Sequence, residues 1–332
     1  MIDIRPPKRA LVLGVNGQDG SYLAQALLRQ GWRVLGVGRQ RASRWLPLSD
    51  SFSYHALDLA HLQALSAFLI RHRPDTIFHF AAVHGPSGFL YEEHWQEVHA
   101  INTVTVHLIL EFLRSSSPDT LLVYASSAKV FDFERLGHIS ESSPRQSSCI
   151  YTTTKNAATD LINYYRHKHK IKASVVWTFN HESPRRGTGY FVPQIVDNLA
   201  KSIVDTKHTG EIATLNFWCD WGDAEEFMQI VASQPESLAD HDFILATGTT
   251  LWARDVVQAI FTKYYSSWHN HLVEKNPYNE STPKIWHADI TLLESTLKLR
   301  PQRTIFNIVD DILRLNYPKA WEIFTTHRGV TV

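Results

Sequence analysis

Short apolar runs alternate with longer stretches of helical periodicity through the first 180 residues of the chain. The apolar runs predict buried strands at 10–13, 33–37, 53–57, 76–80, 120–125 and 173–178. The stretches between them predict helices at 21–30, 59–72, 92–114 and 151–169. Strands that are apolar throughout are covered on both faces, and alternating β and α units join parallel strands through right-handed crossovers. The expected fold class is therefore α/β, a Rossmann-type doubly wound parallel sheet.

The alternation fades after residue 180, where motifs are interleaved with loops. This change predicts a Rossmann dinucleotide-binding domain over residues 8–180 and a smaller C-terminal substrate-binding lobe over residues 181–330. Some interleaving of the two parts is expected.

Composition and charge argue against several classes of function. Of 332 residues, 33 are Lys or Arg and 33 are Asp or Glu, and the net charge of zero argues against a general nucleic-acid binder. No apolar run reaches the roughly 18 residues of a transmembrane helix, and the first residues lack the apolar stretch of a signal peptide. Cys149 and Cys219 are the only cysteines, and no histidine pair has convincing metal-ligand spacing. We expect a cytoplasmic protein with no metal site and no nucleic-acid or membrane partner.

Three glycines follow the first predicted strand directly, and a helix begins after them. Glycines at this place permit a tight turn and let backbone N–H groups approach a pyrophosphate at the helix N-terminus. A glycine triplet alone is weak evidence, but its place between strand and helix predicts a dinucleotide site rather than an ordinary glycine-rich turn. The residues expected to contact the cofactor here are Gly14, Asn16, Gly17, Gln18, Asp19 and Gly20.

The residues after the second strand predict which dinucleotide binds. An acidic residue there would favour a free ribose 2′-hydroxyl, but residues 38–44 contain arginines and no acid. Arg39 and Arg41 can form bidentate contacts with a 2′-phosphate, so NADP(H) is favoured over NAD(H). A solvated basic loop is the alternative. Asp58, after the third strand, is a candidate for the adenine edge or for a helix cap.

Candidate catalytic residues lie at the fifth strand and the helix after it. Ser126 and Ser127 end that strand at the carboxyl edge of the sheet, where ligands bind in this fold class. Tyr151 and Lys155 open the helix and share one face, being four residues apart. A nearby ammonium favours the phenolate and so lowers the pKa of a phenol. Tyr151 can then take a proton from a substrate hydroxyl that Ser127 holds, while hydride leaves the same carbon. Lys155 would also hold the nicotinamide ribose.

The Tyr-x-x-x-Lys spacing is weak evidence by itself, because the chain carries a second copy at Tyr164 and Lys168. That copy lies deeper in the helix, away from the sheet edge, and we assign it to packing or to the surface. The combination of glycine turn, strand-end serine and helix-start tyrosine and lysine is far more specific.

These residues resemble the extended short-chain dehydrogenase/reductases that act on nucleotide-activated sugars, the NAD-dependent epimerase/dehydratase family, and most of all the GDP-mannose 4,6-dehydratases. The similarity covers most of the chain from Ala10 to about Asp310, and its most specific block is Phe-Asn-His-Glu-Ser-Pro-Arg-Arg-Gly at 179–187. The other segments that carry it are 14–24, 220–222 and 243–248. The resemblance implies a nucleotide-sugar substrate, bound NADP(H) and a homodimer or homotetramer.

Carried over residue by residue, the resemblance implies further contacts. Additional cofactor contacts are expected from Asp58, Leu59, Ala81, Ala82, His84, Tyr151, Lys155, His181 and Arg186. Substrate contacts are expected from Ser126, Ser127, Asn180, Arg185 and Cys219. Loop packing is the alternative for His84, and a surface position is the alternative for the two arginines.

The sequence departs from the dehydratases at a catalytic position. In that family a glutamate, two positions after the hydroxyl residue of the fifth-strand motif, removes the C5 proton while water leaves from C6. Here Lys129 occupies that position. A lysine acts as a base only if burial lowers its pKa by several units. The motif also resembles that of sugar 4-epimerases and reductases, which need only tyrosine chemistry at C4.

The contacts that the family makes with the substrate diphosphate are also reduced. The family's lysine after the Arg-Arg-Gly block falls within residues 191–195, which contain none, and Trp218-Cys219 stand where the family has an arginine. Residues 209–253 hold eight acids and no Lys or Arg. We expect this like charge to weaken attraction for a diphosphate.

The function expected is NAD(P)-dependent oxidation or reduction at C4 of a nucleotide-activated hexose. Three reactions remain open: 4,6-dehydration with Lys129 as a catalytic group, 4-epimerisation, and 4-keto reduction. A catalytically inactive NADP-binding homologue is the further alternative.

Overall fold

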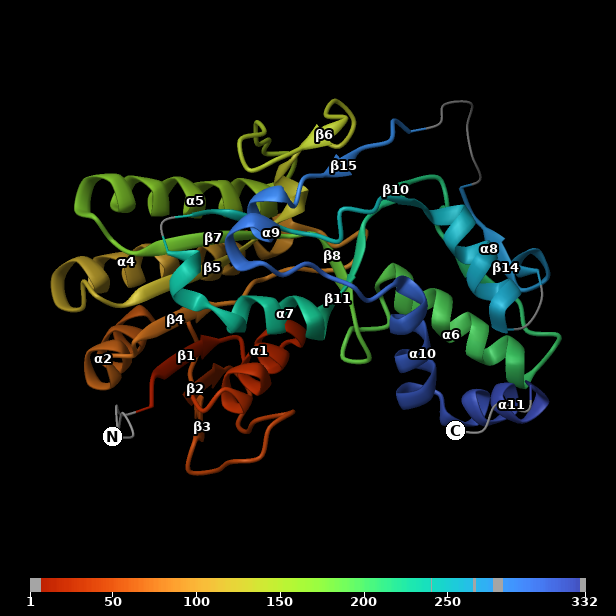
Figure 1. Ribbon diagram of the computed structural model, residues 1–332, viewed down its shortest axis with the longest axis horizontal. Coiled ribbons are helices and arrows are strands. Elements are labelled where there is room, and N and C mark those ends of the chain that lie inside the picture. Colours follow the sequence, from red (N-terminus) through yellow and green to blue (C-terminus); the bar gives the residue numbers. More distant parts are fainter. Residues whose placement is uncertain (1–6, 240, 265–266, 277–282, 329–332) are drawn as a thin grey trace.

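The computed structural model describes residues 7–239, 241–264, 267–276 and 283–328. Its centre is a seven-stranded sheet in the order β12-β7-β5-β4-β1-β2-β3, parallel throughout (Figure 1). The strands are β1 (Arg9–Leu13), β2 (Arg33–Gly38), β3 (Phe52–Ala56), β4 (Thr76–His79), β5 (Leu121–Ser127), β7 (Ala173–Thr178) and β12 (Phe243–Leu245). All but β12 match the predicted strands to within about two residues, so the predicted doubly wound fold is confirmed.

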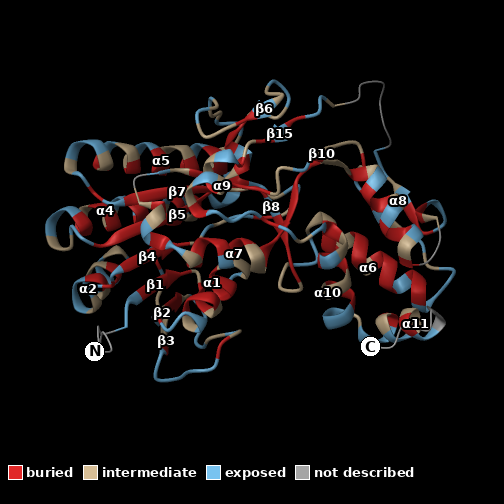
Figure 2. Cartoon of the chain, in the orientation of Figure 1, coloured by how far each residue is buried: buried red, intermediate tan, exposed pale blue. Residues whose placement is uncertain are grey.

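Helices cover both faces of this sheet, as strands without polar alternation require. One face is covered by α2 (Leu62–His72), α4 (Thr105–Ser116) and α5 (Ile150–His169). The other is covered by α1 (Gln18–Arg29), α7 (Ala224–Ser233) and α9 (Thr291–Leu297). Leu11 and Leu13 of β1 face the first layer, and Ala10 and Val12 face the second. Figure 2 shows the resulting concentration of buried residues in the sheet and on the facing sides of the helices.

The helix predicted over residues 92–114 is divided into segments. They are η1 (Tyr91–His94), α3 (Trp95–His99), the π-helical turn η2 (Ala100–Val104) and α4. The π-turn holds the buried carboxamide of Asn102, whose Oδ1 accepts the Val83 N–H at 3.0 Å and whose Nδ2 donates to Thr154 Oγ1 at 3.3 Å. Such turns are frequent at functional sites. This one ties the loop after β4 to α5.

The C-terminal lobe is a helical unit with short strand pairs. Its helices are α6 (Phe191–Val204), α8 (Ala253–Tyr264), α10 (Ile305–Asn316) and α11 (Pro318–Arg328), and they share one hydrophobic core. Its strand pairs are β9 (Gly210–Ile212) with β14 (Leu272–Glu274) and β10 (Trp218–Cys219) with β13 (Leu251–Trp252). The short helices η3 (Ala128–Val130), η4 (Pro235–Leu238) and η5 (Trp268–Asn270) lie in connections. No helix in the described part of the chain is long and apolar enough to cross a membrane.

Residue 180 does not divide the chain into two contiguous domains. Two strand pairs join segments far apart in sequence, β8 (Asn180–Glu182) with β11 (Trp221–Asp223) and β6 (His138–Ile139) with β15 (His287–Ala288). After β11 the chain returns to the sheet, where α7 packs beside α1 and β12 pairs with β7. The chain therefore passes between the sheet and the lobe several times (Figure 1).

Candidate active site

Close backbone approaches shape the glycine turn between β1 and α1. Gly14 has a φ of +89°, and a Cβ there would lie 2.8 Å from the backbone of Ala81. A Cβ on Gly20 would lie 2.3 Å from the carbonyl oxygen of Gly14. The Gly17 N–H donates to that same carbonyl at 2.9 Å and closes the turn. The first and third positions therefore admit only glycine, and the turn presents bare backbone at the sheet edge.

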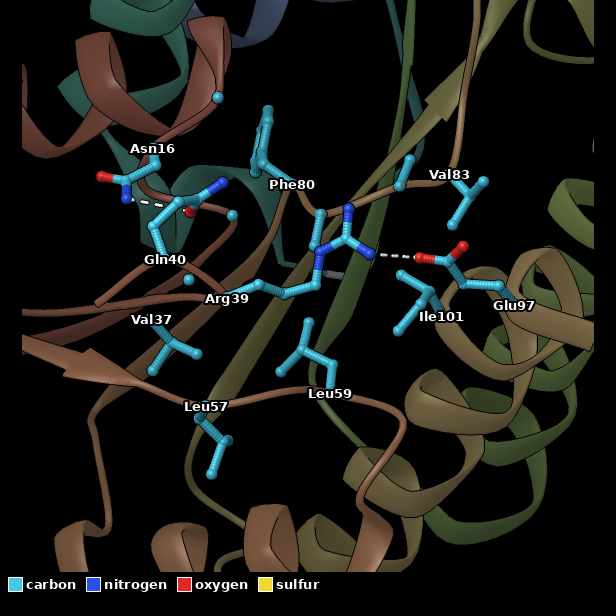
Figure 3. A pocket seen from close by; sticks show the side chains of 15 residues that line it. Asn16, Val37, Arg39, Gln40, Leu57, Leu59, Phe80, Val83, Glu97 and Ile101 are labelled. Atoms are coloured by element: carbon cyan, nitrogen blue, oxygen red, sulfur yellow. Dashed lines mark hydrogen bonds and ion pairs between the residues drawn. The ribbon is translucent and has the colours of Figure 1, made fainter. Parts of the chain in front are cut away.

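A cavity of about 260 Å³ opens beside this turn, at the carboxyl edge of the sheet (Figure 3). Glycine backbone forms one side, Leu57 and Leu59 the other, and Ala81 and Ala82 continue the lining beyond β4. Asp58 is exposed between the two leucines, and its Oδ1 accepts the Ala60 N–H at 3.0 Å in a local turn. A narrow, largely apolar slot that ends in bare backbone suits an adenosine followed by a pyrophosphate.

The arginines predicted to select NADP(H) lie at the rim of this cavity. Arg39 lines it and forms an ion pair with Glu97 of α3 (Figure 3). Arg41 is exposed on the same loop. The guanidinium of Arg39 is therefore already paired with a carboxylate that belongs to the cavity wall.

Asn16 holds the arginine loop in place. Its Nδ2 donates to Gln40 Oε1 and to the Ala42 carbonyl, both at 3.0 Å, and its Oδ1 accepts the Arg44 N–H at 2.9 Å. The amide predicted to contact the cofactor is thus occupied by the protein, and the residue positions the loop that carries the arginines.

A buried ion pair joins the start of α1 to β8. Asp19 Oδ1 lies 2.8 Å from His181 Nε2, and Ser183 Oγ donates to Gln18 Oε1 at 2.8 Å. Burial raises the pKa of Asp19, but the charge and hydrogen bond of His181, with Arg186, outweigh it and lower the pKa to about 2. Burial lowers the pKa of His181, and the charge of Asp19 raises it above its ordinary value. The contacts of Gln18, Asp19 and His181, which are all predicted cofactor residues, therefore join the glycine turn to the lobe.

Replacing Asp19 by Asn should destabilise the protein by about 2 kcal/mol near pH 5.5, because it removes a charge-assisted hydrogen bond. A depressed Asp pKa stabilises the fold above pH 3.8 and loses that contribution as pH falls toward 2. A raised His pKa stabilises it below pH 6.5 and loses that contribution as pH rises through the folded value. Urea unfolding of both proteins at pH 5.5 and 9 should show a larger difference at pH 5.5.

The exposed ion pair of Asp119 with Lys172 supplies the control for this prediction. Asp119→Asn should change stability little at either pH, since exposed pairs contribute little. An Asp19→Asn effect of equal size at pH 5.5 and pH 9 would contradict the ion-pair account.

Ser127, Tyr151 and Lys155 converge at the carboxyl end of β5. Lys155 is 2% exposed, donates from Nζ to the Ala125 carbonyl at 2.7 Å, and lies 5.7 Å from the centroid of the Tyr151 ring. Burial raises the pKa of Tyr151, while a hydrogen bond with Ser127 and the charge of Arg186 oppose that rise. Burial lowers the pKa of Lys155 to about 7. The sequence-predicted trio is therefore assembled around one buried phenol.

Ser126, the neighbour of Ser127 in the strand, is placed differently. It is 3% exposed, and its hydroxyl has no hydrogen-bond partner among the described residues. Successive side chains of a strand point to opposite faces, so Ser126 and Ser127 cannot both contact one ligand atom.

An aromatic cluster forms the wall beside Tyr151. Tyr91 stacks on Tyr151 with ring centroids 5.5 Å apart, and the His84 ring lies 4.6 Å from that of Tyr151. The Tyr91 hydroxyl and His84 Nδ1 are hydrogen-bonded at 2.7 Å. Desolvation, followed by the charges of Arg186 and Lys129, lowers the pKa of His84 to about 3, although part of the side chain is open to solvent. His84 is thus a neutral imidazole held against the Tyr151 ring.

Lys129 lies beside this wall, against the Tyr91 ring. Its Nζ is 5.4 Å from the centroid of the Tyr91 ring, and its backbone N–H donates to Ser127 Oγ at 3.2 Å. The side chain is exposed.

The two arginines of the 183–187 loop point in different directions. Arg185 lies on α1, where its guanidinium carbon is 3.9 Å from the Tyr22 ring centroid and Nη1 donates to Ser21 Oγ at 2.7 Å. It lines neither the cofactor cavity nor the second cavity, which is described next, so its predicted substrate contact has no geometric support. Arg186 stacks on Tyr190 at 3.7 Å and lies 3.6 Å from the buried Glu182 carboxylate. Arg186 therefore faces the catalytic end of the cleft.

A second cavity, of about 660 Å³, lies on the lobe side of the cleft. Its lining includes two predicted substrate residues, Asn180 and Cys219, and burial raises the pKa of the Cys219 thiol, which is therefore neutral. Most of the remaining lining is aromatic: Phe133, Phe179, Phe217, Trp218 and Trp286. The charged lining residues are Glu134 and Lys284. The wall therefore offers stacking surfaces and few charges.

The expectation that the acids of residues 209–253 weaken the attraction for a bound diphosphate is wrong. Asp240 lies outside the described residues, and the other seven acids line no part of this cavity. They bind elsewhere: Glu211 to Lys275, Asp220 to Thr247, Asp223 to Arg303, Glu225 to Arg29, Glu226 to the N–H groups of residues 302 and 303, Glu236 to Lys8, and Asp242 to Arg166. A count along the sequence cannot register cations that the fold supplies from distant segments.

Several site residues were missed by the sequence reasoning. They are Tyr91, Glu97, Asn102, Glu182 and Tyr190. One signal was available, since Asn102 is a polar residue at a core position of an otherwise apolar helix. Glu182 lies inside the specific block at 179–187 and Glu97 lies in the helix predicted over 92–114, whereas Tyr91 and Tyr190 lie in segments without a distinctive pattern.

The comparison with known families decides the assignment, because the model of the GDP-mannose 4,6 dehydratase family matches residues 11–311. The chain belongs to the GDP-mannose 4,6-dehydratase family. A GDP-mannose 4,6-dehydratase of Sordaria araneosa is 30% identical over 270 residues, covering 78% of this chain and 48% of that protein. The chain thus spans about half the length of that relative.

Two solved structures resemble the fold of this member of the GDP-mannose 4,6-dehydratase family. The dTDP-glucose 4,6-dehydratase of Bacillus anthracis has a TM-score of 0.76 at 14% identity and covers 95% of this chain and 99% of that one. The UDP-glucuronic acid 4-epimerase of Bacillus cereus has a TM-score of 0.74 at 18% identity, with 98% and 99% covered. At these identities the likeness supports the fold alone.

Proposed function

We propose that the protein is an NAD(P)-dependent enzyme that oxidises or reduces C4 of a nucleotide-activated hexose, as a 4-epimerase or 4-keto reductase rather than a 4,6-dehydratase. The observation that carries the proposal is the convergence of Ser127, Tyr151 and Lys155 beside a wall whose ammonium, Lys129, replaces the family's carboxylate.

The cofactor cavity fits a nicotinamide dinucleotide. Its bare-backbone turn exists only because Gly14 and Gly20 lack a Cβ, which leaves N–H groups at the start of α1 for a pyrophosphate. When bound, the nicotinamide accepts or supplies a hydride. Lys155 and the Asp19–His181 pair would hold the nicotinamide half of the dinucleotide. Arg39 and Arg41 would bind a 2′-phosphate.

Tyr151 does the acid–base work at C4. Ser127 and Tyr151 hydrogen-bond the C4 oxygen, and the phenolate of Tyr151 takes its proton on oxidation and returns it on reduction. Lys155, when it is protonated, favours that phenolate against the burial that opposes it. His84 packs on the ring and keeps the phenol oriented.

Dehydration needs a base at C5, and position 129 holds an exposed lysine where the family has a carboxylate. Lys129→Glu restores the family's carboxylate and should produce water loss from GDP-mannose in a protein that otherwise shows none. Lys129→Gln is the matched control, because it removes the ammonium without adding a base. Mass spectrometry of the product distinguishes the two, and equal products from both variants would show that position 129 does not decide the reaction.

The aromatic cavity is proposed to hold the nucleotide, with a planar base stacked on its rings and Asn180 and Asn216 available for polar contacts. The Oδ1 of Asn216 is buried without a partner among the described residues. Lys284, which lines this cavity, and Arg186 are the cations that we propose for a diphosphate. We further propose a cytoplasmic homodimer or homotetramer, in line with two free cysteines, and light scattering of the purified protein would test the assembly.

A preference for NADP(H) rests on the arginine loop. Arg39→Ala should weaken NADP⁺ binding about tenfold and NAD⁺ binding less than about twofold, because only NADP⁺ offers a 2′-phosphate. Glu97→Gln releases Arg39 from its ion pair and should strengthen NADP⁺ binding. Calorimetric titration of the three proteins with both dinucleotides measures this, and equal losses for NAD⁺ and NADP⁺ in Arg39→Ala would remove the basis for the preference.

Incubation with NADP⁺ and a panel of nucleotide hexoses, GDP-mannose and UDP-glucose among them, tests the function. Nuclear magnetic resonance should reveal a change at C4 that is lost in Tyr151→Phe. If the dinucleotide binds and no sugar changes at C4, the protein is a catalytically inactive NADP-binding homologue and the proposal is wrong.

A further inference from the structure

An unpaired ammonium stands one aromatic ring away from the catalytic phenol. Lys129 Nζ is 5.4 Å from the Tyr91 ring centroid, and Tyr91 stacks on Tyr151 at 5.5 Å with an interplanar angle of 28°. Lys129 is exposed, and its side chain forms no ion pair or hydrogen bond with the residues that the structure describes. A positive charge without a partner at this place is available to a ligand.

The residues around this ammonium add no negative charge to the wall. His84 is neutral, as its depressed pKa shows, and it is close enough to Lys129 for the lysine charge to contribute to that depression. Glu182, the carboxylate at the other end of the cleft, is 3.6 Å from Arg186 and is paired there. Asp19 is paired with His181. No carboxylate among the described residues forms an ion pair with Lys129, so this ammonium is open to an anion.

The geometry places Lys129 beside the ring carbons that neighbour the proposed reacting carbon, C4. Its backbone N–H donates to Ser127 Oγ at 3.2 Å, and Ser127 shares a hydrogen bond with Tyr151. The hydroxyl that these two side chains hold is therefore flanked by the start of the Lys129 side chain. The long, flexible stem of a lysine brings its ammonium to a substituent on an adjacent ring carbon.

We propose that the sugar which this site binds carries a carboxylate at C6, so that the substrate class is a nucleotide-linked hexuronate and Lys129 is the residue that selects it. The inference rests on the proposed function, because the C4 oxygen must be the one held by Ser127 and Tyr151. A C6 carboxylate has no hydroxyl to lose as water. Oxidation then transfers hydride from C4 to the nicotinamide and the O4 proton to Tyr151, and the C5–C6 bond is untouched.

The proposal predicts a preference that is measurable without turnover. The protein saturated with NADPH, which cannot oxidise the sugar, is titrated calorimetrically with UDP-glucuronate against UDP-glucose and with GDP-mannuronate against GDP-mannose. Each pair shares base and diphosphate, so any difference belongs to the carboxylate. In at least one pair the uronate should bind about tenfold more tightly, and the preference should shrink as salt rises.

Variants assign the preference to Lys129. Lys129→Gln should abolish it and leave the neutral sugar's affinity within about twofold, and Lys129→Arg should keep most of it, since the charge is retained. Lys168→Gln removes an exposed lysine from the far end of α5 and should leave the preference intact. Equal affinities for both members of each pair in the wild type would overturn this inference and leave the proposed function standing. A preference that survives in Lys129→Gln would do the same. NADPH binding without binding of any of the four sugar nucleotides would overturn the proposed function as well.

Discussion

Tyr151→Phe should lower turnover at C4 by about 10³-fold while dinucleotide affinity stays nearly unchanged. The substitution removes the proton acceptor that we propose for the C4 oxygen, and acid–base catalysis of this kind contributes about 10²–10⁴ to rate. The ring itself remains, so its packing against Tyr91 and His84 is preserved. Rates measured by loss or gain of reduced cofactor, with calorimetric binding alongside, give both quantities.

Tyr164→Phe is the matched control because it alters the second Tyr-x-x-x-Lys pair on the same helix. Tyr164 is 56% exposed and lies away from the cleft. Its replacement should change neither rate nor binding by more than about twofold. A Tyr151→Phe protein that retains a tenth or more of wild-type turnover would remove the tyrosine from its assigned role.

Gly14→Ala should weaken dinucleotide binding at least about 100-fold and lower the melting temperature. Alanine at a φ of +89° costs about 1–2 kcal/mol, and its Cβ would press on the Ala81 backbone from 2.8 Å. The strand and the turn cannot both stay in place, so the N–H groups at the start of α1 lose their alignment. Calorimetric titration with NADP⁺ measures the loss, and thermal unfolding separates a shifted turn from a protein that no longer folds.

Gly137→Ala serves as the comparison. Gly137 has an ordinary φ, and a Cβ there would meet nothing closer than the flexible end of Lys284 at 3.5 Å. Binding of NADP⁺ should be unaffected by this change. Unweakened NADP⁺ binding in folded Gly14→Ala would show that the turn does not hold the dinucleotide.

Local patterns predicted the sheet and the catalytic trio because both depend on residues close together in sequence. Apolar runs specify β1 to β5 and β7 directly, and Tyr151 and Lys155 lie within one helical turn after a strand end. β12 was missed because three residues, Phe243–Leu245, form it at the end of an excursion into the lobe. Its pairing with β7 depends on packing that no local pattern records.

The remainder of the site depends on contacts between distant segments. Asn16 binds the loop that carries Arg44, Arg185 binds α1, and His84 binds Tyr91 through a loop that follows no periodicity. The acids of residues 209–253 show the same limit, since their partners include Lys8, just before β1, and Arg29 of α1. Sequence can indicate which side chains carry chemistry, but the fold decides which of them remain available to a ligand.

The mass of the sugar product tests the central claim most directly. The wild-type protein is incubated with NADP⁺ and each nucleotide hexose that it binds, and the products are resolved by mass spectrometry. Because position 129 holds an exposed lysine where the family has a carboxylate, the account predicts products of unchanged mass, or lighter by two hydrogens, that depend on Tyr151. A product lighter by one water molecule would contradict it and make the protein a 4,6-dehydratase that works without the family's glutamate.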